Sequence, residues 1–203
     1  MEEARLNEVT KVLFKLILIY LFILTITHTT TLSNVSGGSM EKTYKDNDWL
    51  LVNRIYTNIN RGDIIVAKWR NLLIVKRVIG VGGDRIEIKD NKVYVNNSLK
   101  NEEYIKEKMS SKNMTIVVPS NELFVMGDNR NNSVDSRNEL IGCISENSIL
   151  GKVAFDLGNA SSGYVKFIAI IVGLCGICWH LVDFIIKTFD NMLVGKRKAD
   201  NIN

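Results

Sequence analysis

The sequence predicts a mainly β domain flanked by two membrane-spanning helices. No charged residue occurs between Lys15 and Glu41, and a second apolar run covers residues 164–186. The segment between these runs contains many short, strand-like stretches separated by turn residues. Because these stretches lack helical periodicity, they indicate a barrel-like or sandwich-like β domain.

The first apolar run begins near Val12 and continues through a threonine-rich tail to Leu32. Its length of about 20 residues is enough to cross ~30 Å of hydrocarbon. A cleavable signal peptide is the alternative. Its cleavage site could fall only around residues 36–38, inside a motif described below, so we expect an anchor that is not cleaved.

The second apolar run is rich in isoleucine, valine and small residues, with Lys166 at its entry and Lys187 near its exit. Its length also suits a membrane span. His180 and Asp183 interrupt its apolar character, so a buried or interfacial helix is the alternative.

Basic residues lie outside both runs, at Arg5, Lys11 and Lys15 before the first and at 196–198 after the second. Positive charge of this kind marks the cytoplasmic side of a membrane protein. We therefore expect a two-pass protein of the plasma membrane. Its expected parts are a cytoplasmic N-terminus and anchor (1–32), an extracytoplasmic β domain (33–163) and a second span with a basic cytoplasmic tail (164–203).

The formal net charge of +4 over 203 residues is too small to indicate nucleic-acid binding. Three cysteines do not form a disulfide framework. Cys175 and Cys178 lie within the second apolar run, where we expect them to pack against a helix rather than bind metal. Cys143 is expected to be buried. No metal ion or cofactor is predicted.

The middle segment contains seven predicted strands, bounded by turns that are rich in glycine, asparagine and aspartate. The strands cover residues 49–52, 63–69, 72–79, 85–89, 92–95, 114–118 and 123–126. Asp90 and Asn91 separate two runs of alternating character and predict a tight β-hairpin. Residues 1–11 and 101–111 are expected to be helical or irregular.

The stretch Ser36 to Met40 joins the first apolar run to the β domain and contains Gly37 and Gly38. Glycines allow backbone angles that other residues avoid. The hydroxyl of Ser39 beside bare backbone N–H groups suits acyl chemistry, which needs a nucleophile and donors for an oxyanion. A flexible linker is the alternative.

Lys76 lies in a predicted strand whose period of two places it on one face with Ile74 and Val78. Burial there lowers the pKa of a lysine, and the neighbouring Arg77 is expected to lower that pKa further. A neutral lysine can take a proton from a serine. The alternative is an edge-strand lysine whose ammonium reaches water.

The polar stretch 127–137 follows the last predicted strand and contains two Asp-x-Arg pairs, Asp128 with Arg130 and Asp135 with Arg137. Ion pairs of this kind can lock a loop against the core. Ser133 lies between them, in a position to orient a base. A solvated loop is the alternative.

Together these stretches resemble type I signal peptidase, the membrane-bound serine protease that removes signal peptides from exported proteins. Four motifs match in order: 36–40 with Thr43, 61–65, 76–80 with 83–84, and 127–137. The resemblance covers residues 32–153. It implies that Ser39 is the nucleophile and Lys76 the general base, as in the bacterial branch.

The resemblance also assigns roles to the residues around this dyad. Ser133 would hydrogen-bond to the lysine and orient it, and the backbone of residues 37–39 would supply the oxyanion donors. Structural support would come from Arg77, Asp128, Arg130, Asp135 and Arg137.

Members of the family cleave after small residues at the −1 and −3 positions and bind the substrate as an added strand. Val35, Met40, Ile74 and Val75 adjoin the motifs and are expected to line the substrate pockets. The expected partners are signal-peptide-bearing preproteins and membrane lipid.

The sequence departs from the family pattern at several positions. Lys42 and Gly82 stand where prolines are usual, and the glycine expected after Arg137 arrives only at Gly142. Gly37 lacks the serine hydroxyl that some relatives add to the oxyanion hole. Two alternatives follow: a weakly active or inactive accessory that binds an exported partner such as a surface-fibre subunit, and a self-cleaving Ser–Lys regulator of similar fold.

Overall fold

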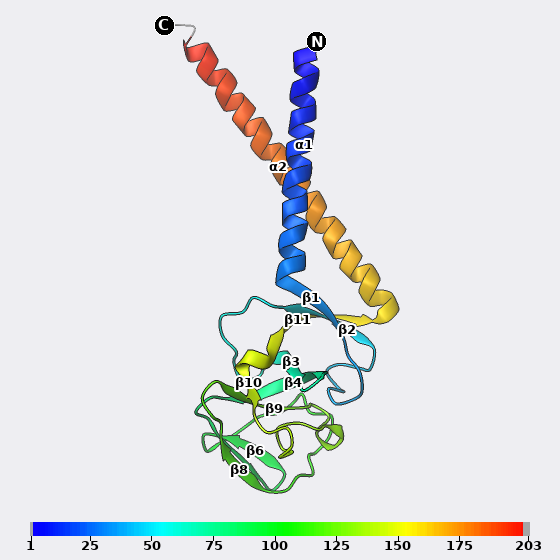
Figure 1. Cartoon of the computed structure of the whole chain (residues 1–203), viewed down its shortest axis with the longest axis vertical. Helices are drawn as coiled ribbons and strands as arrows, with labels where there is room; N and C mark the ends of the chain where they lie inside the picture. Colours follow the sequence, from blue (N-terminus) through cyan, green and yellow to red (C-terminus); the bar gives the residue numbers. More distant parts are fainter. Residues whose placement is uncertain (1, 201–203) are drawn as a thin grey trace. The chain divides into compact units, whose positions relative to one another are not determined.

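A computed structural model describes the backbone of residues 2–200 and the side chains of residues 10–159 and most of 166–188 (Figure 1). The predicted basic side chains of Arg5 and of 196–198 lie outside the described residues. Contacts divide the chain into a helical unit, Met1–His28 with Val165–Asn203, and a β unit, Thr29–Tyr164.

The helical unit is formed by two long helices, α1 (Glu2–Thr29) and α2 (Ala160–Asp200), drawn in blue and in yellow to red in Figure 1. The segments Thr10–Thr29 and Lys166–Thr188 are long and apolar enough to cross a membrane, with mean hydropathy values of 2.0 and 2.2. Most of their described side chains are exposed, as expected of helices that face lipid.

Lys15 of α1 forms an ion pair with Asp183 of α2. The Lys15 ammonium also lies 4.8 Å from the centroid of the Trp179 ring, and Lys187 approaches the same carboxylate at 3.1 Å. A charged side chain within an apolar helix is costly unless it is paired. The aspartate that interrupts the second apolar run therefore has a partner on the first.

The β unit contains two antiparallel sheets. The larger sheet has seven strands, in the order β1 (Thr30–Asn34), β2 (Asp48–Asn53), β11 (Ile149–Asn159), β3 (Ile64–Trp69), β4 (Leu72–Val81), β9 (Glu122–Met126) and β10 (Ile144–Ser145). The smaller sheet has four, in the order β7 (Ser98–Leu99), β6 (Lys92–Val95), β5 (Arg85–Lys89) and β8 (Met114–Val117). Two 3₁₀ turns, Arg130–Asn132 and Glu146–Ser148, complete the described elements.

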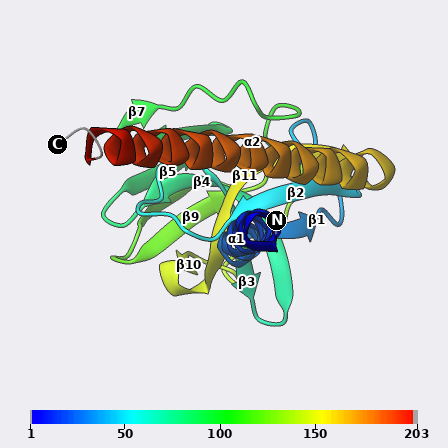
Figure 2. The same cartoon turned by 90° about the horizontal axis from the view of Figure 1, so that it is seen from above.

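The mainly β prediction is confirmed, but among the described residues no closed barrel forms. Each sheet is open, and the larger one ends at β1 on one side and at β10 on the other. Closure would require continuous pairing of the outermost strands, and β10 has only two residues to pair. Seen from above, β10 and β7 lie on opposite sides of the unit (Figure 2).

Three apolar clusters form the core of the β unit, built largely from side chains that alternate along the strands. The first packs the small sheet against β4 and β9 and includes Ile86, Val93, Phe124 and Met126. The second lies on one face of the large sheet and includes Ile65, Val78 and Val125. The third includes Val35, Met40, Leu50, Val52 and Val66.

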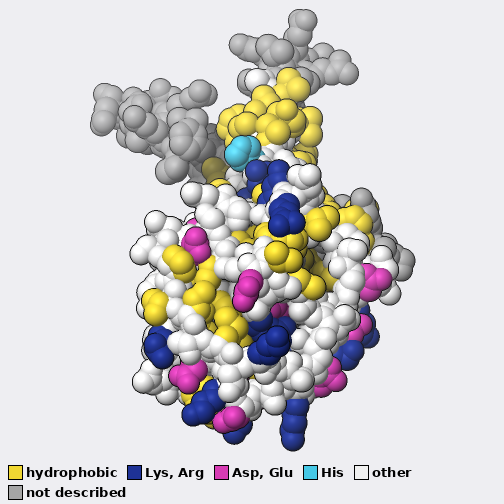
Figure 3. Space-filling view, turned by 60° about the horizontal axis from the view of Figure 1, so that its bottom comes forward, with side chains coloured by type: hydrophobic (Ala, Val, Ile, Leu, Met, Phe, Trp, Pro, Cys, Tyr) yellow, Lys and Arg dark blue, Asp and Glu magenta, His cyan; other side chains and the backbone are white. Residues whose placement is uncertain are grey.

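Charged side chains of both signs occur on the face of the molecule drawn in Figure 3. The face drawn in Figure 3 carries a band of apolar side chains with basic and acidic side chains around it. Neither sign dominates that face, in keeping with the small net charge of the chain.

All seven predicted strands are present, within a few residues of their predicted bounds. The hairpin at Asp90 and Asn91 joins β5 to β6, and both residues have positive φ, 51° and 60°, as a two-residue turn of this kind requires. Residues 30–32, which we predicted to belong to the anchor, instead pair with β2. β-Branched threonines favour a strand at this point.

Candidate active site

Ser39 lies in the turn that joins β1 to β2. The turn is closed by hydrogen bonds from Val35 N to Asp48 O and from Tyr44 N to Met40 O, both 2.8 Å long. Val35 and Met40 are almost fully buried and anchor the turn in the core on both sides of the serine. Gly37 has a φ of +85°, which an L side chain rarely adopts. The backbone therefore explains why this position lacks a serine.

Lys76 lies on β4 and is 5% exposed. Its Nζ donates a hydrogen bond of 2.7 Å to Ser39 Oγ, so two residues far apart in sequence meet. Burial lowers the pKa of Lys76, against the opposing effect of the Asp135 carboxylate. The guanidinium that lowers this pKa further is that of Arg137, whereas Arg77, which we expected to do so, is paired with Asp128.

The loop after β9 surrounds this pair with buried charges. Arg137 donates from Nε and Nη2 to Asp135, each at 2.8 Å. Burial alone would raise the pKa of Asp135, but the bonds from Arg137 outweigh it and lower that pKa. A Cβ at Gly127 would lie 2.4 Å from Ser39 O, so only glycine allows the loop to approach the serine turn this closely.

Arg130, by contrast, does not pair with Asp128 as its Asp-x-Arg spacing suggested. It is 1% exposed and donates from Nη1 and Nη2 to Glu102, at 2.8 and 2.6 Å. Asp128 pairs with Arg77 on β4 instead. Both arginines still connect the loop to other parts of the domain.

Ser133 does not hydrogen-bond to Lys76. Its Oγ is buried and has no hydrogen-bond partner among the described residues. Lys76 Nζ instead donates to Ser39. The predicted orienting contact is therefore not formed in this structure.

The four residues expected to line the substrate pockets do not share one surface. Val35, Met40 and Val75 belong to or pack against the third apolar cluster, while Ile74 packs against the second. Adjacent residues on a strand point to opposite faces, which separates Ile74 from Val75. Ile74 shares the face of β4 that carries Lys76, whereas Val75 packs with Val35 and Met40, so the assignment of all four to substrate pockets stays a prediction.

Residues 101–111, which we predicted to be helical or irregular, are irregular, and several of them contact the active-site loops. The guanidinium carbon of Arg77 lies 4.1 Å from the centroid of the Tyr104 ring. The backbone N of Lys106 donates a hydrogen bond to Asp128 O. Lys42 has a φ of 68° and its Nζ donates to Glu103 O and Ile105 O. Proline cannot adopt this φ, which accounts for the absence of the family's usual proline at this position.

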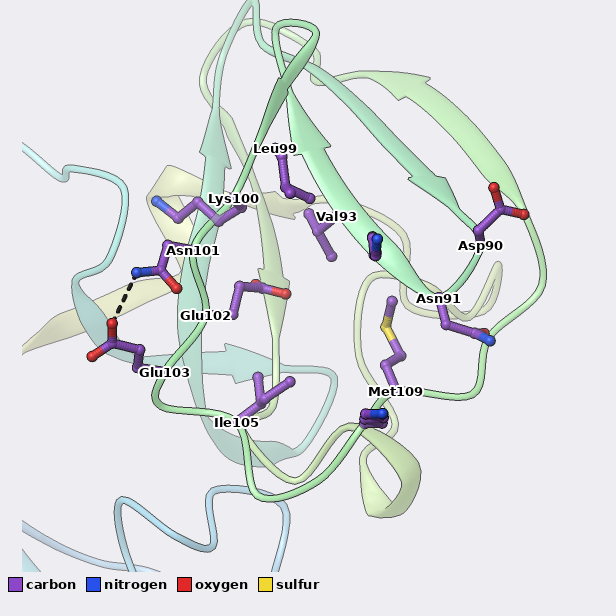
Figure 4. Close-up of a pocket in the computed structure, with 12 residues that line it drawn as sticks. Asp90, Asn91, Val93, Leu99, Lys100, Asn101, Glu102, Glu103, Ile105 and Met109 are labelled. Atoms are coloured by element: carbon purple, nitrogen blue, oxygen red, sulfur yellow. Dashed lines mark hydrogen bonds between the residues drawn. The ribbon is translucent and has the colours of Figure 1, made fainter.

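The far side of the same segment lines a cavity of about 550 Å³ (Figure 4). Its apolar lining comes from Val93, Leu99, Ile105 and Met109. Two further lining residues are joined by a hydrogen bond of 2.9 Å from Asn101 to Glu103. Neither Ser39 nor Lys76 contributes to this cavity.

Asn129 is a site residue that the sequence did not single out. It is 2% exposed and bonds to the serine turn through both its backbone and its side chain. An asparagine within a polar loop gives no signal of burial, so only the folded arrangement reveals it.

Comparisons with a family model and with known proteins all match this chain to signal peptidases. Residues 6–157 match the family model described as signal peptidase, peptidase S26. The chain is 42% identical to signal peptidase I P of Bacillus subtilis subsp. natto over 132 residues, covering 58% of this chain and 71% of the relative. It is 41% identical to signal peptidase I U of Bacillus subtilis strain 168 over 131 residues, covering 58% and 70%.

Among solved structures, the signal peptidase I of Enterococcus faecalis V583 is 29% identical, with a TM-score of 0.44, and the match covers 48% of this chain and 98% of that one. The family match extends over most of the β unit and includes every motif described above. This chain belongs to the signal peptidase family, peptidase S26.

Proposed function

We propose that this chain is a membrane-bound serine endopeptidase that removes signal peptides from exported preproteins through a Ser39–Lys76 dyad. The observation that carries the proposal is the 2.7 Å hydrogen bond between Lys76 Nζ and Ser39 Oγ. Family membership supports the substrate class, because the relatives are signal peptidases.

In this mechanism the neutral amine of Lys76 takes the proton of Ser39 Oγ as the oxygen attacks the scissile carbonyl. The carbonyl oxygen becomes an oxyanion that backbone N–H groups of the serine turn stabilise. Lys76 then gives its proton to the leaving amine, and an acyl-enzyme remains on Ser39. Water, deprotonated by Lys76, hydrolyses the ester and restores both groups.

The surrounding ion pairs have a positioning role. Asp135 and Arg137 are largely buried and bond mainly to each other and to backbone atoms of the loop. Their charges oppose one another at Lys76, so burial remains the main influence on its pKa. A lysine whose pKa is lowered loses its proton more readily and is therefore better suited to act as a general base.

We also propose that the chain crosses the plasma membrane twice, with the β unit outside. Lys15 lies between one and two turns after Thr10, where the first candidate span begins, and Asp183 lies the same distance before Thr188, where the second ends. Antiparallel spans with both termini on one side would bring these two residues to the same depth. Their ion pair supports this arrangement.

Purified full-length chain in detergent, incubated with a preprotein carrying a signal peptide, tests the activity. We expect cleavage after the small residue at −1, and none with Ser39→Ala. Ser36→Ala is the matched control, because Ser36 is exposed and lies in the same turn, whereas the Lys76 ammonium donates to Ser39. Preprotein that is bound but not cleaved by the unmodified chain would favour the accessory-protein alternative.

A further inference from the structure

We propose that Asn129 positions the oxyanion-binding N–H of Ser39. The inference rests on the proposed function, because it concerns the same serine. It assigns Asn129 a role that none of the residues singled out from the sequence fills, namely holding the peptide that supplies the donor.

Asn129 contacts the serine turn at two successive carbonyls. Its Nδ2 donates to Gly38 O at 2.9 Å, and its backbone N donates to Ser39 O at 3.0 Å. The same Nδ2 also lies 3.3 Å from Glu41 Oε2. Because Asn129 is almost fully buried, water does not compete strongly for these bonds.

The bond to Gly38 O determines where the N–H of Ser39 points. The peptide between Gly38 and Ser39 is trans, so its C=O and N–H point in opposite directions. A donor fixed on the carbonyl side therefore fixes the direction of the N–H. The bond also polarises the peptide and makes its N–H a stronger donor.

This N–H is available for a substrate. Within the described part of the chain, no acceptor takes a hydrogen bond from Ser39 N. Gly37 has no hydroxyl to add a second donor, and its φ of +85° disfavours a side chain there. The Ser39 N–H is thus the chief oxyanion donor that this turn offers. Its direction therefore strongly affects how well the turn stabilises the oxyanion.

The loop that carries Asn129 is well suited to hold a fixed position. Asp128 before it and Arg130 after it are both at most 1% exposed, and each forms a two-point ion pair with a partner on another segment. An amide side chain between two such anchors can define a carbonyl position closely.

The test compares Asn129→Ala with Asn131→Ala in the full-length chain. Asn131 is a control from the same loop, because its side chain makes three hydrogen bonds, all to residues 107–110 and none to the serine turn. Asn129→Ala keeps the backbone bond to Ser39 O. We expect kcat/KM for a preprotein to fall about 10- to 100-fold in Asn129→Ala, mainly in kcat, and less than about threefold in Asn131→Ala.

A second measurement separates positioning from a general loss of structure. A peptide boronate adds to Ser39 Oγ and places an oxygen where the oxyanion forms, whereas an uncleavable peptide binds only as a ground-state ligand. We expect Asn129→Ala to weaken boronate binding in parallel with kcat/KM and to leave peptide binding within about twofold. Equal losses for both ligands, or a loss for neither, would overturn the role of Asn129. Absence of cleavage and of boronate binding by the unmodified chain would instead contradict the proposed dyad.

Discussion

The guanidinium of Arg77 donates two hydrogen bonds to the carboxylate of Asp128, from Nε to Oδ1 at 2.8 Å and from Nη2 to Oδ2 at 2.6 Å. The two side chains are 12% and 0% exposed. The Thr43 hydroxyl donates to the same carboxylate. This pair ties β4, which carries Lys76, to the loop after β9 and to the segment that follows the serine turn.

Breaking this pair should strongly destabilise the β unit. Arg77→Met leaves the Asp128 carboxylate buried without its main partner, which costs about 3–5 kcal/mol in buried pairs of this kind. Urea unfolding of the full-length chain in detergent, followed by tryptophan fluorescence, measures the change. Lys106→Met is the control, because it breaks an exposed ion pair, with Glu41, and exposed pairs contribute little to stability. Equal effects of the two substitutions would show that burial of the Arg77 pair contributes nothing extra.

Lys76 should make both activity and stability depend on pH. Its pKa is lowered by burial, so kcat/KM should rise with pH as the amine loses its proton. The unfolded chain, with a lysine pKa of about 10.4, binds this proton more readily than the folded chain. The free energy of unfolding should therefore rise as pH increases from the folded pKa towards the unfolded one.

Lys76→Met removes this titration while keeping the length of the side chain. Its unfolding free energy should lack the lysine's contribution to the pH slope, and the difference between the two proteins should shrink towards high pH. A slope that is identical in Lys76→Met and the unmodified chain would mean that the lysine pKa is not lowered by folding.

Lys42 provides a test of the backbone at the family's proline position. Lys42→Pro should destabilise the chain and reduce cleavage, because proline requires a φ near −65° where the structure has 68°. Lys42→Gly loses the same ammonium contacts to the 101–110 segment but accepts the positive φ. We expect it to stay within about 1 kcal/mol of the unmodified chain in urea unfolding. If proline proves the better tolerated of the two, the turn differs from the one described.

The Lys15–Asp183 pair should help to hold the second span in place. Asp183→Lys sets two like charges against each other, so we expect a larger fraction of chains whose C-terminal tag is digested by protease added to intact spheroplasts. The exchanged variant, Lys15→Asp with Asp183→Lys, should restore protection. A tag that is as protected in Asp183→Lys as in the unmodified chain would show that the pair has no part in the topology.

Much of the fold could be predicted because short-range patterns specify it. Alternation of apolar residues defined the strands, and turn residues such as Asp90 and Asn91 defined their ends. β11 was missed because its burial alternates poorly and its pairing with β2 and β3 contains irregularities. Of the barrel-like and sandwich-like forms that we expected, a closed barrel is not formed by the described strands. The sequence does not reveal which strands remain at the edges of a sheet.

The site was less predictable than the fold. The motifs pointed to Ser39 and Lys76, which the structure brings together. The ion-pair partners of the loop could not be predicted from sequence spacing. Asp128 and Arg130 are two residues apart, yet Asp128 pairs with Arg77 and Arg130 pairs with Glu102. Long-range hydrogen bonds of this kind depend on how the loops pack, which local sequence does not encode.

The dyad itself is tested most directly by trapping the acyl-enzyme. Preprotein mixed with the full-length chain and quenched in acid within a single turnover should give a covalent adduct that mass spectrometry locates on Ser39. Lys76→Met should give neither adduct nor cleaved product, and Ser36→Ala should give both. An adduct on another residue, or normal turnover by Lys76→Met, would contradict the Ser39–Lys76 mechanism.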